Sequence, residues 1–176
     1  AAPTLSAEQA EALEQIRAIP VDRFGVALLD GVTGGGKTEV FFEAVADTLR
    51  AGRQALILLP EIALTNTFIE RFTRRFGTRP AEWHSDMTPA QRARTWRAVL
   101  SGRVRAVLGA RSSLFLPFRE LGLIVLDEEH DGAFKQSDGV NYHARDMAVV
   151  RARQADARVV LSSATPSVES RNNANV

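Results

Sequence analysis

Two hydrophobic patterns alternate along the chain. In short runs nearly every residue is apolar, as in residues 55–59, whereas in longer segments apolar residues recur three or four positions apart, as in Phe68, Phe72 and Phe76. The first pattern is typical of a strand that is covered on both faces, and the second is typical of a helix with one buried face. The chain therefore predicts strands that alternate with helices.

The predicted elements cover most of the chain. Strands are expected at residues 26–29, 54–59, 81–84, 104–108, 121–126 and 158–161. Helices are expected at residues 7–18, 39–50, 68–76, 89–100 and 143–155, two of them after the capping signals Ser6 and Thr88-Pro89. This alternation predicts an α/β fold, a three-layer sandwich in which helices cover both faces of a parallel sheet.

The length of 176 residues fits one domain with a core of its own. We expect residues 1–176 to form a single unit, with residues 171–176 as a frayed tail because that segment carries no packing signal. The chain opens on Ala1 rather than on methionine and passes directly into sequence typical of a domain. We therefore expect a fragment of a longer protein.

The composition is that of an ordinary globular protein, with 45% hydrophobic and 24% charged residues. The net charge of +1 is too small to indicate nucleic acid as a partner by itself. The absence of cysteine excludes disulfides and thiolate zinc sites and favours a cytoplasmic protein. No apolar run is long enough to span a membrane, so we expect no membrane association.

A glycine-rich segment, residues 31–38, lies between the first predicted strand and the second predicted helix. It matches G-x-x-x-x-G-K-[ST] in a strand–loop–helix context, which disfavours the alternative of a glycine-rich turn with a surface lysine. Its backbone N–H groups and the following helix N-terminus suit a phosphate. Lys37 is expected to reach the β- and γ-phosphates, and Thr38 to offer its hydroxyl to Mg²⁺. The residues expected to bind the nucleotide are Gly31, Thr33, Gly34, Gly35, Gly36, Lys37 and Thr38.

A cluster of acidic residues, Asp127-Glu128-Glu129-His130, follows the apolar run at residues 121–126. Ligands of open α/β sheets collect at the carboxyl ends of the strands, where these acids lie. We expect Asp127 to hold Mg²⁺ through water, opposite Thr38, and Glu128 to orient and deprotonate the attacking water. The alternative, a strand that ends in solvated acids, is weakened by the phosphate loop that precedes it. Lys37, Asp127 and Glu128 are therefore the predicted catalytic residues.

Four segments in this order resemble the first RecA-like motor lobe of superfamily 2 helicases: residues 31–38, Leu58-Leu59-Pro60-Glu61-Ile62, Asp127-Glu128-Glu129-His130 and Ser163-Ala164-Thr165-Pro166-Ser167. A narrower resemblance links the chain to the PriA family of bacterial primosomal replication-restart helicases. It rests on residues 30–40, Pro60-Glu61-Ile62-Ala63-Leu64-Thr65, His84-Ser85, residues 127–131 and Tyr142-His143-Ala144-Arg145-Asp146. The resemblance covers about residues 5 to 170.

The resemblance implies further roles around the nucleotide. Gln9 matches the glutamine that reads adenine, and its amide suits the adenine edge because it both donates and accepts; the alternative is a surface helix residue. Ser163 and Thr165 match the motif that relays the nucleotide state to the other lobe, and His130 is expected to share this coupling role. The strand before Ser163 is implied to lie between the phosphate-loop strand and the acidic strand.

The resemblance also implies a DNA-binding rim. The matching residues are Pro60 and Glu61, then Arg111 and Ser112, then Phe134, Lys135 and Tyr142 in and after the segment that follows the acidic cluster. Hydroxyl, arginine and lysine groups suit phosphate contacts, and aromatic rings suit base stacking. Ordinary loop turns and ordinary packing of the rings remain the alternatives. Four residues depart from the usual family pattern: Gly35 for serine, Ala110 for threonine, Ser113 for alanine and Ser162 for glycine.

The implied activity is Mg²⁺-dependent ATP hydrolysis that drives translocation on single-stranded DNA and unwinding of duplex DNA at stalled forks in replication restart. The implied partners are DNA, a second lobe of the same chain and primosome proteins. Because the second lobe supplies an arginine finger, worth roughly 10³ to 10⁵ in rate, the isolated lobe is expected to bind ATP weakly and hydrolyse it poorly. Two other functions stay open: the first lobe of another superfamily 2 translocase, and a nucleotide-gated interaction module that does not hydrolyse ATP.

Overall fold

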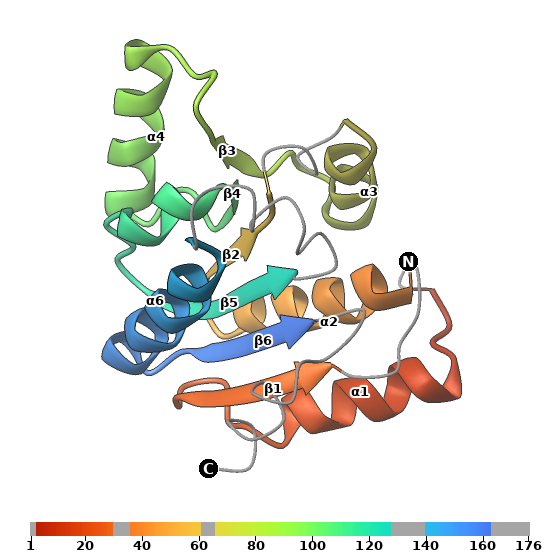
Figure 1. Cartoon of the computed structure of the whole chain (residues 1–176). Coiled ribbons are helices and arrows are strands. Elements are labelled where there is room, and N and C mark those ends of the chain that lie inside the picture. The colour runs from red at the N-terminus through yellow and green to blue at the C-terminus, as the bar shows by residue number, and fades with distance from the viewer. Residues whose placement is uncertain (1–2, 30–35, 61–65, 128–139, 163–176) are drawn as a thin grey trace.

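The computed structural model describes residues 3–29, 36–60, 66–127 and 140–162, with side chains from Ala144 onward in the last segment. These residues form a six-stranded sheet in which every neighbouring pair is parallel, in the order β1-β6-β5-β2-β4-β3 (Figure 1). The strands are β1 Gly25–Leu29, β2 Gln54–Leu58, β3 Ala81–Trp83, β4 Ala106–Gly109, β5 Leu121–Asp127 and β6 Arg158–Ser162.

Helices cover both faces of this sheet, which confirms the predicted three-layer α/β sandwich (Figure 1). The helices are α1 Ala7–Arg17, α2 Gly36–Arg50, α3 Asn66–Phe76, α4 Pro89–Leu100 and α6 Val140–Ala155. A short 3-10 helix, Arg111–Phe115, follows β4. In the described part of the chain, none of the helices has the length and apolarity that crossing a bilayer requires.

The central strands carry two apolar faces. Along β2, Ala55 and Ile57 pack with α1, α2 and α3, whereas Leu56 and Leu58 pack with α6 and the 3-10 helix on the opposite side. Successive side chains of a strand point to opposite faces, so a strand covered twice needs apolar residues at every position. This explains the uninterrupted apolar run that predicted β2.

The predicted helix starts are confirmed by their caps. Ser6 and Thr88 each accept a hydrogen bond at their hydroxyl from the backbone N–H three residues later, at 3.2 Å. The side chains of Gln9 and Gln91 return the bond to the two cap residues, which completes two capping boxes. Pro89 occupies the first turn of α4, where its missing N–H costs nothing.

Arg53 stabilises the edge of the sheet at which the strands begin. Its guanidinium donates hydrogen bonds at 2.7 to 3.0 Å to four backbone carbonyls, those of Val21, Leu121, Ala155 and Asp156. These carbonyls belong to the segment before β1, the start of β5 and the segment that leads into β6. Burial lowers the pKa of a second arginine at this edge, Arg158, which donates to the carbonyl of Ile16 at 3.3 Å.

Replacing Arg53 with alanine should therefore lower the stability of the fold by about 2–4 kcal/mol, because several charge-assisted hydrogen bonds are lost and their acceptors are left without partners. Urea unfolding followed by circular dichroism measures this. Arg50→Ala is the matched control: Arg50 is exposed and pairs with Asp47 at 3.2 Å, so its loss should cost less than about 1 kcal/mol. Equal effects of the two substitutions would contradict the clamping role of Arg53.

Candidate active site

Three strands end side by side at the carboxyl edge of the sheet. β6 lies between β1 and β5, and Ser162 at the end of β6 is in register with Leu29 on one side and Asp127 on the other. This order confirms the expectation that the strand before Ser163 separates the phosphate-loop strand from the acidic strand. The segments that follow β1, β6 and β5 therefore all begin at neighbouring positions on the carboxyl edge of the sheet.

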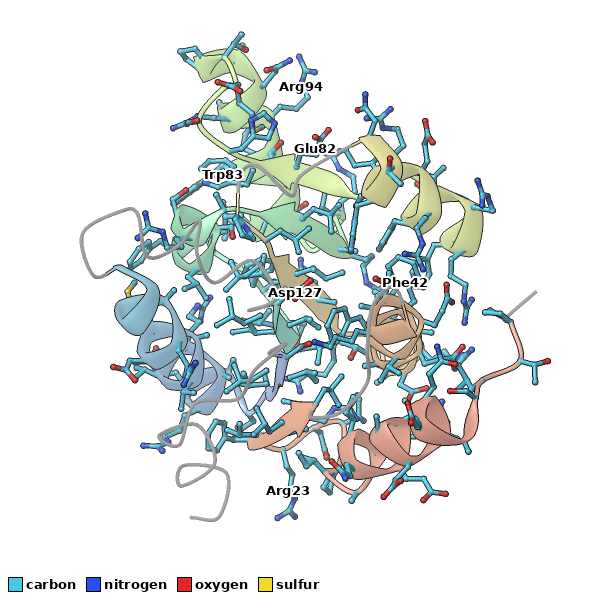
Figure 2. The ribbon with its side chains drawn as sticks, turned by 45° about the vertical axis from the view of Figure 1, so that its right-hand side comes forward. Arg23, Phe42, Glu82, Trp83, Arg94 and Asp127 are labelled. Atoms are coloured by element: carbon cyan, nitrogen blue, oxygen red, sulfur yellow. The ribbon has the colours of Figure 1, made fainter. Side chains whose placement is uncertain are left out.

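Asp127 and the first turn of α2 share one face of the sheet. Leu29 belongs to the same core cluster as Val40 and Phe41 of α2, and residues in register on parallel strands point to the same face. Asp127 and Ser162 therefore project toward the α2 side. In Figure 2, Asp127 lies near the centre of the molecule at the end of β5. The carboxylate predicted to hold a metal is thus on the side of the helix that follows the glycine-rich segment.

The start of α2 carries the two predicted phosphate and metal groups. α2 begins at Gly36, Lys37 is only 2% exposed and Thr38 is half-buried. Asp127 is 7% exposed. A buried lysine in the first turn of a helix suits an anion, and a buried carboxylate at a strand end on the same face of the sheet suits a cation. A nucleoside triphosphate with a hydrated Mg²⁺ ion has this chemistry, so the described residues fit both groups.

Gln9 joins the N-terminal helix to this site. Its side-chain oxygen accepts a hydrogen bond from the N–H of Ser6 at 2.7 Å, and its side-chain nitrogen donates to the carbonyl of Gly36 at 3.0 Å. The predicted adenine reader therefore also ties the start of α1 to the start of α2. One N–H of its amide and one lone pair of its oxygen are not used by these two hydrogen bonds.

The described DNA-rim candidates lie in different environments. Pro60 is buried, so its ring offers no surface to DNA in this structure. Arg111 is half-buried and Ser112 is exposed, both in the 3-10 helix after β4. Tyr142 lies in α6, where only its backbone is described. The other predicted residues, Gly31, Thr33, Gly34, Gly35, Glu61, Glu128, His130, Phe134, Lys135, Ser163 and Thr165, lie outside the described residues and stay predictions.

Trp83 holds the 3-10 helix that carries two of the DNA-rim candidates, and the sequence analysis missed it. Its indole N–H donates to the hydroxyl of Ser112 at 3.1 Å, and the guanidinium of Arg92 lies over its ring at 5.6 Å. Arg92 also donates to the carbonyl of His84 at 3.0 Å. The end of β3, α4 and the 3-10 helix are therefore held together. A tryptophan beside the His84-Ser85 pair was the available signal, but its partner is 29 residues away in sequence.

With this geometry in hand, comparison with known proteins identifies the family. A model of the family described as DEAD/DEAH box helicase matches residues 6–174. The chain belongs to the DEAD/DEAH box helicase family. Membership of this helicase family implies nucleotide use, which agrees with the chemistry of the site.

Several relatives of this helicase chain carry the name replication restart protein PriA. The chain is 51% identical over 167 residues to the protein of Rickettsia felis, 46% over 170 residues to that of Haemophilus influenzae and 43% over 167 residues to that of Bacillus subtilis. These matches cover 94–97% of the chain but only 21–25% of each relative. The chain thus spans about a quarter of the length of these relatives.

A solved structure shares the fold of this helicase chain. The structure of RecG bound to a three-way DNA junction superposes with a TM-score of 0.66 at 22% sequence identity, over 98% of the chain and 22% of RecG. At this identity the likeness concerns the fold, which is thereby confirmed as RecA-like.

Gly109 tests the position of the DNA rim. A side chain at residue 109 would overlap Ser113, because the 3-10 helix turns back against the end of β4 and the Ser113 hydroxyl donates to the carbonyl of Ala110. Gly109→Ala should cost about 1–3 kcal/mol of stability and displace Arg111 and Ser112, so affinity for single-stranded DNA should fall. Fluorescence anisotropy with labelled oligonucleotide and urea unfolding measure the two effects.

The second substitution Ser113→Gly removes the two Ser113 atoms, Cβ and Oγ, that a Gly109→Ala side chain would overlap, and leaves only an ordinary contact with Leu56. The double variant should recover at least about 0.5–1 kcal/mol relative to the sum of the single effects, together with part of the DNA affinity. If the stability effects of the two single substitutions simply added, a direct clash between the two positions would be contradicted. If DNA affinity were unchanged in Gly109→Ala, the 3-10 helix would not be part of the DNA-binding surface.

Proposed function

We propose that this chain is the ATP-binding motor lobe of a longer DNA helicase that acts in replication restart. One observation carries the proposal: β6 separates β1 from β5, so the start of α2 and Asp127 share one face at one edge of the sheet. The names of the relatives support the biological process. Residues 1–176 are proposed to be a single lobe, and the second lobe is proposed to belong to the same full-length chain.

In this proposal ATP is held by its phosphates at residues 31–38 and by its adenine at Gln9. Thr38 and, through water, Asp127 would hold Mg²⁺, which would supply positive charge to the nucleotide phosphates. Lys37 reaches the same oxygens as a point charge. Glu128 takes the proton of the attacking water, and the buried surroundings of Lys37 and Asp127 strengthen each electrostatic contact.

The proposed DNA contacts lie on the neighbouring strand ends. Arg111 and Ser112 contact the phosphate backbone, supported by Trp83, and the segment after the acidic cluster contributes Phe134, Lys135 and Tyr142. Pro60 contributes to the DNA contact through its backbone because its ring is buried, and the next residue, Glu61, is also proposed to contact DNA. Ser163, Thr165 and His130 relay the nucleotide state. The proposed partners are single-stranded and forked DNA and the primosome proteins.

Glu128→Gln in the full-length helicase tests hydrolysis directly. DNA-stimulated ATPase activity should fall by roughly 10²- to 10⁴-fold because the general base is lost, while ADP affinity should stay within about two-fold. Steady-state phosphate release and binding of a fluorescent ADP analogue measure the two quantities. Glu120→Gln is the matched control, since Glu120 is exposed and precedes the same strand at its opposite end. Full ATPase activity in Glu128→Gln would contradict catalysis by Glu128 at this site.

The lobe alone should differ sharply from the full-length helicase. At saturating single-stranded DNA, residues 1–176 should hydrolyse ATP roughly 10³- to 10⁵-fold more slowly, because the arginine finger of the second lobe is missing. A side-by-side measurement of steady-state ATPase rates checks this. Comparable rates in the two proteins would mean that the 176-residue chain carries a complete ATP site and that the second lobe has another role.

A further inference from the structure

Ser162 carries a buried hydroxyl that lacks a hydrogen-bond partner in the described structure. The residue is 0% exposed, and its Oγ atom is unpaired. The other buried side-chain atoms in this condition within the described residues are guanidinium nitrogens of Arg75, Arg92 and Arg158. A buried hydroxyl without a partner is unfavourable relative to an alanine or glycine at the same place, so its presence calls for an explanation.

The position of Ser162 points to the nucleotide site. The residue is the Cα partner of Asp127 on β5 and of Leu29 on β1, the last described residue before the glycine-rich segment. Side chains alternate along β6, and Val160 packs in the core cluster that contains Val40 of α2. Ser162 therefore projects to the same face, between the strand end that leads to the phosphate loop and the carboxylate of Asp127.

The chemistry of this place suits a hydrated cation. Mg²⁺ retains several water ligands when it is bound through a carboxylate and nucleotide phosphates, and those waters need acceptors around them. The neighbouring strand position on one side is the apolar Leu29, which offers none. A serine hydroxyl beside Asp127 supplies one acceptor and one donor without adding charge.

We propose that Ser162 is a positioning residue of the ATP site, whose hydroxyl accepts a hydrogen bond from a water ligand of nucleotide-bound Mg²⁺. This inference rests on the proposed nucleotide function. The unpaired hydroxyl then finds its hydrogen-bond partner, a metal-bound water, only when the nucleotide and Mg²⁺ bind. Ser162 and Asp127 together hold the hydrated ion. The residue does not touch the reacting phosphate.

The test compares the full-length wild-type helicase with its Ser162→Ala and Ser162→Gly variants. The affinity for a fluorescent ADP analogue is measured at saturating Mg²⁺ and in EDTA, and the ratio of the two is the Mg²⁺-dependent gain. We expect this ratio to be about five-fold smaller in both variants than in the wild type, which is the effect of one hydrogen bond. The affinity in EDTA should stay unchanged. The unfolding temperature of the ligand-free Ser162→Ala protein should not fall, because an unpaired buried hydroxyl is removed.

Thr48→Val is the matched control. Thr48 is also 0% exposed, but its hydroxyl donates to the carbonyl of Ala44 at 2.9 Å within α2. Its loss should lower the unfolding temperature and leave the Mg²⁺-dependent gain intact. The proposal would be overturned if Ser162→Ala kept a Mg²⁺-dependent gain as large as that of the wild type. It would also be overturned if the variant lost ADP affinity equally with and without Mg²⁺, or if its ligand-free unfolding temperature fell. A wild-type helicase that binds ADP equally with and without Mg²⁺ would overturn the proposed metal site and this inference together.

Discussion

The position of β6 between β1 and β5 is the constraint on which the candidate site depends. The glycine-rich segment follows β1 and the acidic cluster begins at the end of β5, almost a hundred residues later in the chain. Parallel pairing with β6 aligns the two strand ends, and the alternation of side chains directs Asp127 to the face that α2 covers. All strands end at one edge because the sheet is parallel, and the pairing with β6 is what brings the ends of β1 and β5 within one strand of each other.

The two edges of the sheet serve different purposes. At the edge where strands begin, polar side chains are saturated with backbone partners: Arg53 donates to four carbonyls, and Gln54 donates to the carbonyls of Val99 and Val104 while accepting from the N–H of Glu120. At the edge where strands end, Lys37 and Asp127 are buried charges and Ser162 has an unpaired hydroxyl. The first edge stabilises the register of the strands, and the second uses that register to bring Asp127 and Ser162 side by side on the face that α2 covers.

Much of the fold was predictable because local patterns determine it. The doubly covered strand β2 follows from its unbroken apolar run, and the starts of α1 and α4 follow from Ser6 and Thr88. The place of β6 between β1 and β5 was available only through the resemblance, and the order of β2, β4 and β3 was not predicted, since apolar periodicity says which residues are strands and nothing about their neighbours. The 3-10 helix at residues 111–115 was missed because five residues with two central serines carry no helical period.

The roles that escaped prediction depend on partners distant in sequence. Gln9 was expected to face adenine, and the same amide proves to hold Gly36, 27 residues away. Trp83 supports Ser112 and Arg53 reaches Asp156, contacts that no local pattern records. Gln9 shows why this matters for function. A side chain that both caps α1 and holds the first carbonyl of α2 links the two helix starts. In the proposed function, a ligand that engages this amide would therefore act on the helix that carries Lys37 and Thr38.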